Sequence, residues 1–204
     1  MSETQHPSFF APKLHPEFLE RICQEVVSVA YGALADASTE NDTAWTRGTL
    51  LYGRVHGLFK KLSRDPSLPW LILRNSTMDY TISINDVLFQ VVMDDPDAPK
   101  KSYRLLANDV ELMQMSLFDA NPEEIVTWRL FVDNDHNFES PKLTATVVGF
   151  DINRNVICHW SHEYKARIPV KSAHLPDAVE FEDPQPVRRN KDAETETTTD
   201  VDVT

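Results

Sequence analysis

The 204-residue sequence is poor in cysteine and glycine, and it has no long apolar run. Two cysteines, Cys23 and Cys158, are too few for a disulfide framework and are typical of a reducing compartment. No stretch approaches the roughly 18 apolar residues that a membrane span needs, and residues 1–10 show no cationic segment followed by an apolar one. We therefore expect a cytoplasmic protein without membrane contact.

The scarcity of glycine also limits the possible chemistry. Four of the five glycines fall within two predicted helices, which leaves Gly149 alone for a loop or strand. No P-loop, dinucleotide-binding or nucleophile-elbow motif is present. A loop that cradles phosphate is hard to build from one glycine, so we expect no cofactor. The absence of these motifs disfavours an enzyme.

Acidic residues outnumber basic ones by 32 to 20, which gives a formal net charge of −12. This balance disfavours an extended surface for nucleic acid, whose phosphates require cations. With 41% hydrophobic and 25% charged residues, the composition is that of an ordinary globular protein, and the length suits one domain.

The charge is concentrated at the C-terminal end. Residues 177–204 hold nine acids and three bases, a net of −6, and few apolar residues. Such a segment cannot bury enough surface to offset the entropy of ordering. We therefore predict a loose leader over residues 1–14, a single α+β domain over residues 15–171 and a disordered acidic tail over residues 172–204.

Two amphipathic helices are predicted in the first third of the domain. Apolar residues recur every three or four positions over residues 16–37 and again over residues 43–63. Asp42 is a good N-cap for the second helix, and Pro66 ends it. The short polar connection predicts an antiparallel helical hairpin. Gly53 and Gly57 share one face, so we expect them to let the two helices approach closely, with a groove for a partner helix as the alternative.

The rest of the domain has the pattern of strands. Asn85 and Asp86 suit the turn of a hairpin. A short helix is predicted from Asn108 to Phe118, capped by Asn108, with Val110, Leu112, Met113 and Leu117 facing inward. The predicted strands cover residues 70–74, 80–84, 87–92, 125–132, 143–150 and 156–160. The fold class is thus α+β, with the helical hairpin packed on a mainly antiparallel sheet.

Two acidic clusters could hold a divalent cation. One contains Asp94, Asp95 and Asp97 before Lys100 and Lys101, which superficially resembles the PD-x-x-K motif of metal nucleases but lacks the acid and lysine on a following strand. The other contains Asp133 and Asp135. It begins like a calcium loop, but Phe138 and Thr144 stand where that loop needs Gly and Glu. We interpret both as solvated turns and expect no metal site, with a metal-dependent enzyme such as a nuclease as the alternative.

Cys158, His159 and His162 form the densest group of soft ligands. In an extended segment Cys158 and His162 point to one face and His159 to the other, so the two histidines cannot chelate one ion. Cys158 is better explained as a core residue than as a nucleophile, because nothing near it in the sequence marks an activated thiolate.

A basic stripe runs against the overall acidity. Arg47, Arg54 and Lys61 are spaced by seven residues, which places them within about 40° of arc on the second helix. The stripe is either a solvated helix back or the binding site for an acidic partner protein. We take these three residues as the partner-binding candidates. A DNA-binding regulator is a further alternative, which the surrounding acids disfavour.

Several segments between Trp45 and Trp160 resemble a protein family. The segments are residues 47–55, Leu73–Arg74, residues 128–132, residues 149–151 and residues 156–160. In pattern and order they resemble small uncharacterised bacterial and phage proteins encoded beside regulators that join an Xre-type helix-turn-helix to an ImmA/IrrE-type zinc peptidase. The resemblance implies a non-catalytic partner of a toxin or peptidase-type regulator, such as an antitoxin, immunity or phage-defence component. The chain lacks H-E-x-x-H, so it would not be the peptidase itself.

Overall fold

The computed structural model describes residues 5–115, 125, 127–134 and 143–162. The chain divides into two units, Met1–Ala166 and Arg167–Thr204. The second unit lies outside the described residues, and so does the whole segment predicted as an acidic tail, residues 172–204. All elements given below belong to the first unit.

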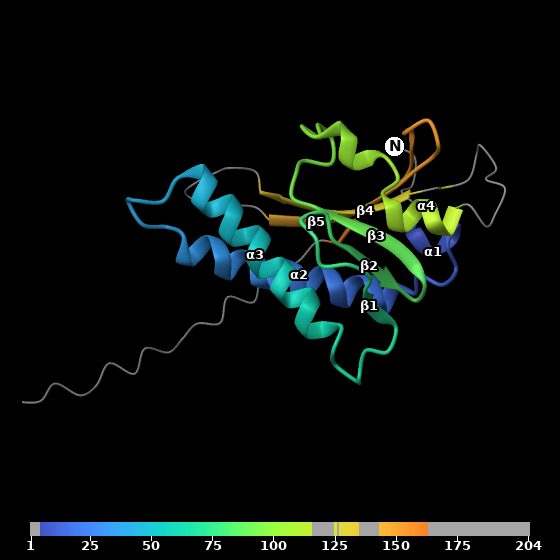
Figure 1. Cartoon of the computed structure of the whole chain (residues 1–204), viewed down its shortest axis with the longest axis horizontal. Helices are drawn as coiled ribbons and strands as arrows, with labels where there is room; N and C mark the ends of the chain where they lie inside the picture. The colour runs from blue at the N-terminus through green and yellow to red at the C-terminus, as the bar shows by residue number, and fades with distance from the viewer. Residues whose placement is uncertain (1–4, 116–124, 126, 135–142, 163–204) are drawn as a thin grey trace, which may run out of the picture. The chain divides into compact units, whose positions relative to one another are not determined.

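Helices precede strands along most of the chain (Figure 1). The helices are α1 (Pro7–Phe10), α2 (Pro16–Asp36), α3 (Ala44–Leu62), the 3-10 helix η1 (Ser102–Leu105) and α4 (Asp109–Met115). The strands are β1 (Leu71–Leu73), β2 (Thr81–Ile84), β3 (Val87–Val92), β4 (Thr127–Asn134), β5 (Leu143–Phe150) and β6 (Val156–His162). The fold is therefore α+β, and the periodicity of the sequence identified each of the longer elements to within a few residues.

The described strands form one six-stranded mixed sheet in the order β1-β2-β3-β4-β5-β6. Neighbouring strands are antiparallel except β3 and β4, which are parallel. The sequence had predicted a mainly antiparallel sheet and did not distinguish this pair. A parallel pair of consecutive strands requires a long crossover, and residues 93–126 supply it.

One face of the sheet packs against α2 and α3. Alternate strand residues, such as Ile82, Phe89, Leu130 and Val147, join the buried residues of these helices in the main core. Helices α2 and α3 pack on each other, and α2 also contacts β5 (Figure 1). Phe18 of α2 stacks on Trp70, with ring centroids 4.3 Å apart.

The opposite face of the sheet buries several polar side chains and only a small apolar cluster among the described residues. Thr81, Ser83, Gln90 and Arg129 are buried on it. A second apolar cluster of Val92, Phe131, Val148 and Phe150 lies on the same face and takes Leu105 of η1 as a partly buried neighbour. The crossover that contains η1 and α4 therefore covers this face.

The crossover contains a difference from the predicted pattern. Asn108 caps α4 as expected, because its side-chain oxygen accepts hydrogen bonds from the amides of Val110 and Glu111 at 3.1 Å. The prediction that Leu112 and Met113 face inward is wrong, since both are at least half exposed. Glu111 is buried instead. Leu117 lies outside the described residues.

Residues 5–14, predicted as part of a loose leader, include helix α1 and pack on the domain. Pro7 and Leu14 are buried, and α1 contacts β6. The four residues of α1 are too few to show a helical pattern in the sequence. Their order comes from contacts with a distant strand.

No helix in the described part of the chain combines the length and the apolar character that crossing a membrane requires.

Candidate interaction surface on helix α3

Helix α3 begins at a capping box formed by Thr43 and Thr46. The Thr43 side chain accepts from the Thr46 amide at 3.2 Å, and the Thr46 hydroxyl accepts from the Thr43 amide at 2.8 Å. The predicted N-cap, Asp42, is wrong by one residue. Its carboxylate accepts instead from the amide and hydroxyl of Thr39, at 2.9 and 2.7 Å, and these bonds lower the pKa of Asp42. The α2–α3 connection is thus held by its own side chains.

Burial divides α3 into two faces. Leu51, Val55, Phe59 and Leu62 enter the core. We call the opposite side the α3 outer face and define it by Thr46, Thr49, Leu50, Gly53 and Gly57, none of which is buried.

The predicted role of Gly53 and Gly57 in close helix packing is wrong. A Cβ atom built on Gly48, Gly53 or Gly57 would meet nothing within 4 Å. Gly53 and Gly57 lie on the side of α3 opposite its four buried apolar residues, so they face away from the core. Each of these glycines costs about 1 kcal/mol relative to alanine inside a helix, and the described fold draws no packing benefit from them.

The basic stripe is split by the structure. Arg54 reaches across to α2, where its Nη2 lies 2.6 Å from Oδ2 of Asp36, and Arg47 donates from Nη1 to the Asp42 carbonyl at 3.2 Å. Lys61 is exposed, as are Lys60 beside it and Arg64 just after the helix. Arg54 therefore joins the two helices, and the outward cations gather at the C-terminal end of α3.

The charge of α3 is unusual for this chain. Residues 44–62 contain four Arg or Lys residues and no Asp or Glu, although the whole sequence has a net charge of −12. Lys60 and Lys61 lie in the last turn, where cations also complement the helix dipole. The helix dipole explains why Lys60 and Lys61 are favoured in the last turn. It does not explain why the whole helix lacks Asp and Glu.

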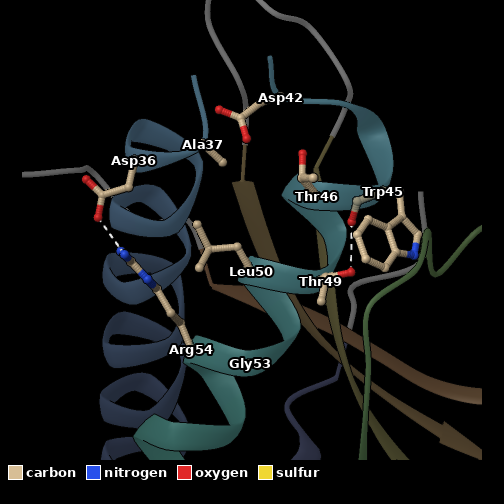
Figure 2. Close-up of a pocket in the computed structure, with 9 residues that line it drawn as sticks. All are labelled: Asp36, Ala37, Asp42, Trp45, Thr46, Thr49, Leu50, Gly53 and Arg54. Atoms are coloured by element: carbon tan, nitrogen blue, oxygen red, sulfur yellow. Dashed lines mark hydrogen bonds and ion pairs between the residues drawn. The ribbon is translucent and has the colours of Figure 1, made fainter. Parts of the chain in front are cut away.

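A shallow hollow of about 450 Å³ lies at the N-terminal half of the α3 outer face (Figure 2). Figure 2 shows Arg54 and Asp36 paired on its α2 side and Trp45 pointing away from that pair. The Trp45 side chain is 76% exposed, the largest aromatic surface among the described residues. The lining residues are Asp36, Ala37, Asp42, Trp45, Thr46, Thr49, Leu50, Gly53 and Arg54.

The first acidic cluster, Asp94 to Asp97, lies in a loop whose backbone amides bond to its own carboxylates. The two carboxylate oxygens of Asp94 accept from the amides of Asp95 and Lys100, at 3.1 and 2.8 Å, and Asp95 accepts from the amide of Asp97 at 2.8 Å. Asp133 lies inside β4, paired with Thr144 of β5, so the prediction that it belongs to a turn is wrong, and Asp135 lies outside the described residues. Within the described ranges, no three His, Cys, Asp or Glu side chains are grouped as a metal site.

Cys158 and His159 point to opposite faces of β6, as predicted. Cys158 and Trp160 pack with the main core, whereas Nε2 of His159 lies 3.7 Å from Oδ1 of Asp97 on the crossover. Burial raises the pKa of the Cys158 thiol to about 11 and that of Cys23 to about 12. Both thiols are buried and unpaired, and their pKa values are the reverse of what a nucleophilic cysteine requires.

Sequence reasoning missed the buried ion pair of Arg129 and Glu111. Arg129 is fully buried, and its Nη1 and Nη2 lie 2.5 and 3.1 Å from the two carboxylate oxygens of Glu111. Its remaining N–H groups donate to the carbonyls of Arg104, Leu106 and Trp128. The available signal was one arginine inside the apolar run of residues 125–132. Its partner could not be identified from the sequence.

The resemblance to proteins encoded beside peptidase regulators stays a prediction. No protein-family model matches the chain, and no curated protein and no solved structure shows significant similarity to it.

Proposed function

We propose that this chain is a non-catalytic binding protein that neutralises or regulates a partner protein, and that α3 is its binding element. The observation that carries the proposal is the exposed side of α3, which is basic and free of acids in a chain with a net charge of −12. Such a surface attracts an acidic partner protein.

Trp45 and the neighbouring hollow support the same element as a contact site. An aromatic side chain that is 76% exposed beside a hollow of about 450 Å³ offers apolar area together with a shape into which a partner side chain fits. Tryptophan is among the residues that most often dominate the energy of protein interfaces.

The exposed glycines give a second reason. Gly53 and Gly57 lower the stability of α3 by about 1 kcal/mol each, and no described atom lies within 4 Å of where their Cβ atoms would be. A partner that approaches the backbone of the α3 outer face would use the space that the missing side chains leave.

The family resemblance extends the proposal to the class of partner. A toxin or a peptidase-type regulator is the proposed partner, in an antitoxin, immunity or phage-defence role. The free cysteines suit a cytoplasmic location, where thiols stay reduced. In this proposal the antiparallel hairpin of α2 and α3, packed on the sheet, presents the site, and a disordered acidic tail over residues 172–204 keeps the chain soluble.

The test captures partners from the cells that naturally encode the chain and then compares their binding to two double-lysine variants. Lys60→Glu with Lys61→Glu reverses two exposed charges on α3, and Lys100→Glu with Lys101→Glu makes the same change on the exposed crossover. Proteins captured by the unmodified chain are identified by mass spectrometry, purified and titrated against all three forms. We expect the α3 variant to bind at least about tenfold more weakly, or 1.4 kcal/mol, and the crossover variant to bind normally.

Equal affinity of the captured partner for both variants would contradict the role of α3. Failure to capture any protein with the unmodified chain would count against a binding function altogether. Far-UV circular dichroism of each variant shows that the fold is retained, so that weaker binding is not confused with unfolding.

A further inference from the structure

The N-terminal arm, residues 5–11, is held on β6 by a small number of contacts. The ring of His6 meets Trp160 edge to face, with centroids 5.0 Å apart at an interplanar angle of 75°. The Sγ–H of Cys158 donates to the carbonyl of Gln5 at 3.7 Å, and Pro7 is buried. The arm thus covers Cys158, which is 3% exposed.

The chain is anchored separately just after the arm. Leu14 is fully buried, and the Lys13 carbonyl accepts from Nδ2 of Asn85 at 3.0 Å. The Lys13 ammonium lies 3.4 Å from a carboxylate oxygen of Asp86. Because the two Lys13 contacts do not involve β6, residues 5–11 can leave β6 while Lys13 stays in place.

His6 holds the arm in a way that requires a neutral ring. Its Nδ1 is the N-cap acceptor of α1: it accepts from the Ser8 amide at 3.1 Å and lies 2.7 Å from the Ser8 hydroxyl. A protonated Nδ1 has no lone pair, so it can no longer accept from the Ser8 amide, and α1 loses this N-cap bond even when the Ser8 hydroxyl rotates to accept from the ring.

The surroundings of the other ring nitrogen add to this requirement. Nε2 of His6 is buried, and no described residue accepts a hydrogen bond from it. Burial lowers the pKa of His6, and the charge of Glu20 on α2 opposes that effect in part. Two titratable groups of β6 lie beside the contacts of the arm: Cys158, whose thiol donates to the Gln5 carbonyl, and His162, whose ring lies 6.0 Å from that of Trp160.

We propose that residues 5–11 form a pH-sensitive strap over β6, closed while His6 is neutral and released when it is protonated, which uncovers Cys158 and Trp160. This device goes beyond the proposed function, because none of its residues belongs to α3.

The direction of the pH effect follows from linkage. His6 in a released arm has a pKa near its ordinary value of 6.5, and the closed arm has a lower one. Closure is therefore fully stable above that ordinary value. It weakens by up to about tenfold per pH unit as the pH falls below it, until the pKa of the closed state is reached.

The test measures how fast 4,4′-dithiodipyridine, a reagent that works in mild acid, modifies Cys158 in the full-length chain. The matched variant is His6→Asn, because asparagine also accepts hydrogen bonds as an N-cap but does not titrate. Rates are measured at about pH 7.5 and about pH 5.5 and assigned by mass spectrometry. Comparing the chain with the variant at the same pH cancels the change in thiolate fraction.

We expect the ratio of the native rate to the His6→Asn rate to rise several-fold, and up to about tenfold, between the higher and the lower pH. This rise is expected whether the variant arm stays closed or opens, since its rate no longer depends on a titrating ring. An unchanged ratio would overturn the proposal. Parallel modification of Cys23, which lies inside the main core, would also overturn it, because acid would then be opening the whole domain.

Discussion

Arg129 shows how a charge is accommodated inside this protein. Its guanidinium has five N–H donors, and the structure supplies five acceptors: two oxygens of Glu111 and the carbonyls of Arg104, Leu106 and Trp128. The carboxylate of Glu111 also accepts from the Asn108 amide at 2.9 Å. One side chain of β4 therefore holds both η1 and α4 against the sheet.

Replacing Arg129 by methionine should destabilise the fold strongly. The change leaves the Glu111 carboxylate buried without its counter-charge, a loss of about 3–5 kcal/mol in buried pairs. The free energy of unfolding in urea measures it. The control is Arg54→Met, which breaks a pair that is 38% and 63% exposed and should cost no more than about 1 kcal/mol. If both variants lose the same free energy of unfolding, the buried pair stabilises the fold no more than the exposed one.

Charge reversal separates the members of the basic stripe. Arg54→Glu places a second carboxylate beside Asp36 and should lower the stability by about 0.5–1 kcal/mol. Lys61→Glu, the same change at an exposed position, should alter it by less than about 0.5 kcal/mol. Thermal unfolding of the two variants is the measurement. If both unfold at the same temperature, the Arg54–Asp36 pair does not contribute to joining α2 and α3.

At the scale of elements, α3 combines a well-packed inner face with an outer face that lacks side chains at two positions. Its capping box and its four buried apolar residues account for the stability of the helix. The glycines of the outer face act in the opposite direction. This contrast supports the binding proposal, which rests first on the basic, acid-free side of α3.

Gly53→Ala should raise the free energy of unfolding by about 0.5–1 kcal/mol, because the new Cβ meets nothing within 4 Å and alanine favours the helix. Gly149→Ala should have the opposite effect. Its Cβ would lie 2.7 Å from Cδ1 of Ile125 and 3.1 Å from the Trp128 ring, so β5 or its neighbours must shift. Urea unfolding of both variants tests the pair. A loss of stability in Gly53→Ala would mean that the α3 outer face is covered within the chain.

Helix α4 shows why hydrophobic periodicity can mislead in a short segment. Leu112 and Met113 suggested an inward face, but the single contact of Glu111 with Arg129 orients the helix the other way. A seven-residue helix has too little apolar area to oppose a buried and fully hydrogen-bonded ion pair. The exposed Leu112 and Met113 are the consequence.

At the scale of the whole molecule, the crossover of residues 93–126 determines the sheet. It turns two strands that are consecutive along the chain, β3 and β4, into a parallel pair at the centre of the six strands. Its described helices, η1 and α4, contact the polar face of the sheet through the partly buried Leu105 and through the hydrogen bonds of Asn108 with Thr81 and of Arg129 with the Leu106 carbonyl.

Removing residues 177–204 should leave the folded domain unchanged. The segment has a net charge of −6 and offers no apolar set to pack. We expect the melting temperature to change by less than about 4 °C, a shift that would correspond to 1–2 kcal/mol in a domain of this size. If the segment contacts a basic partner surface, its removal should slow association in a salt-dependent way and leave dissociation nearly unchanged. A larger fall in melting temperature would show that the segment contributes to the fold.

The sequence by itself determined the elements of the described domain. Periodicity placed α2 and α3, alternation placed the strands, and local chemistry predicted the Asn85–Asp86 turn, where φ is 48° and 70°. Each of these features depends on residues that are neighbours along the chain. The acid-free charge pattern of α3 was equally visible in the sequence.

Only the tertiary structure decided which side chains meet across the chain. It paired Arg129 with Glu111 and Arg54 with Asp36, set β3 parallel to β4, and placed His6 against Trp160. It also left open space within 4 Å of where a Cβ atom would lie on Gly53 and Gly57. The physical reason is that local propensity acts over a few residues, whereas burial and ion pairing join residues whose separation in sequence carries no periodic signal.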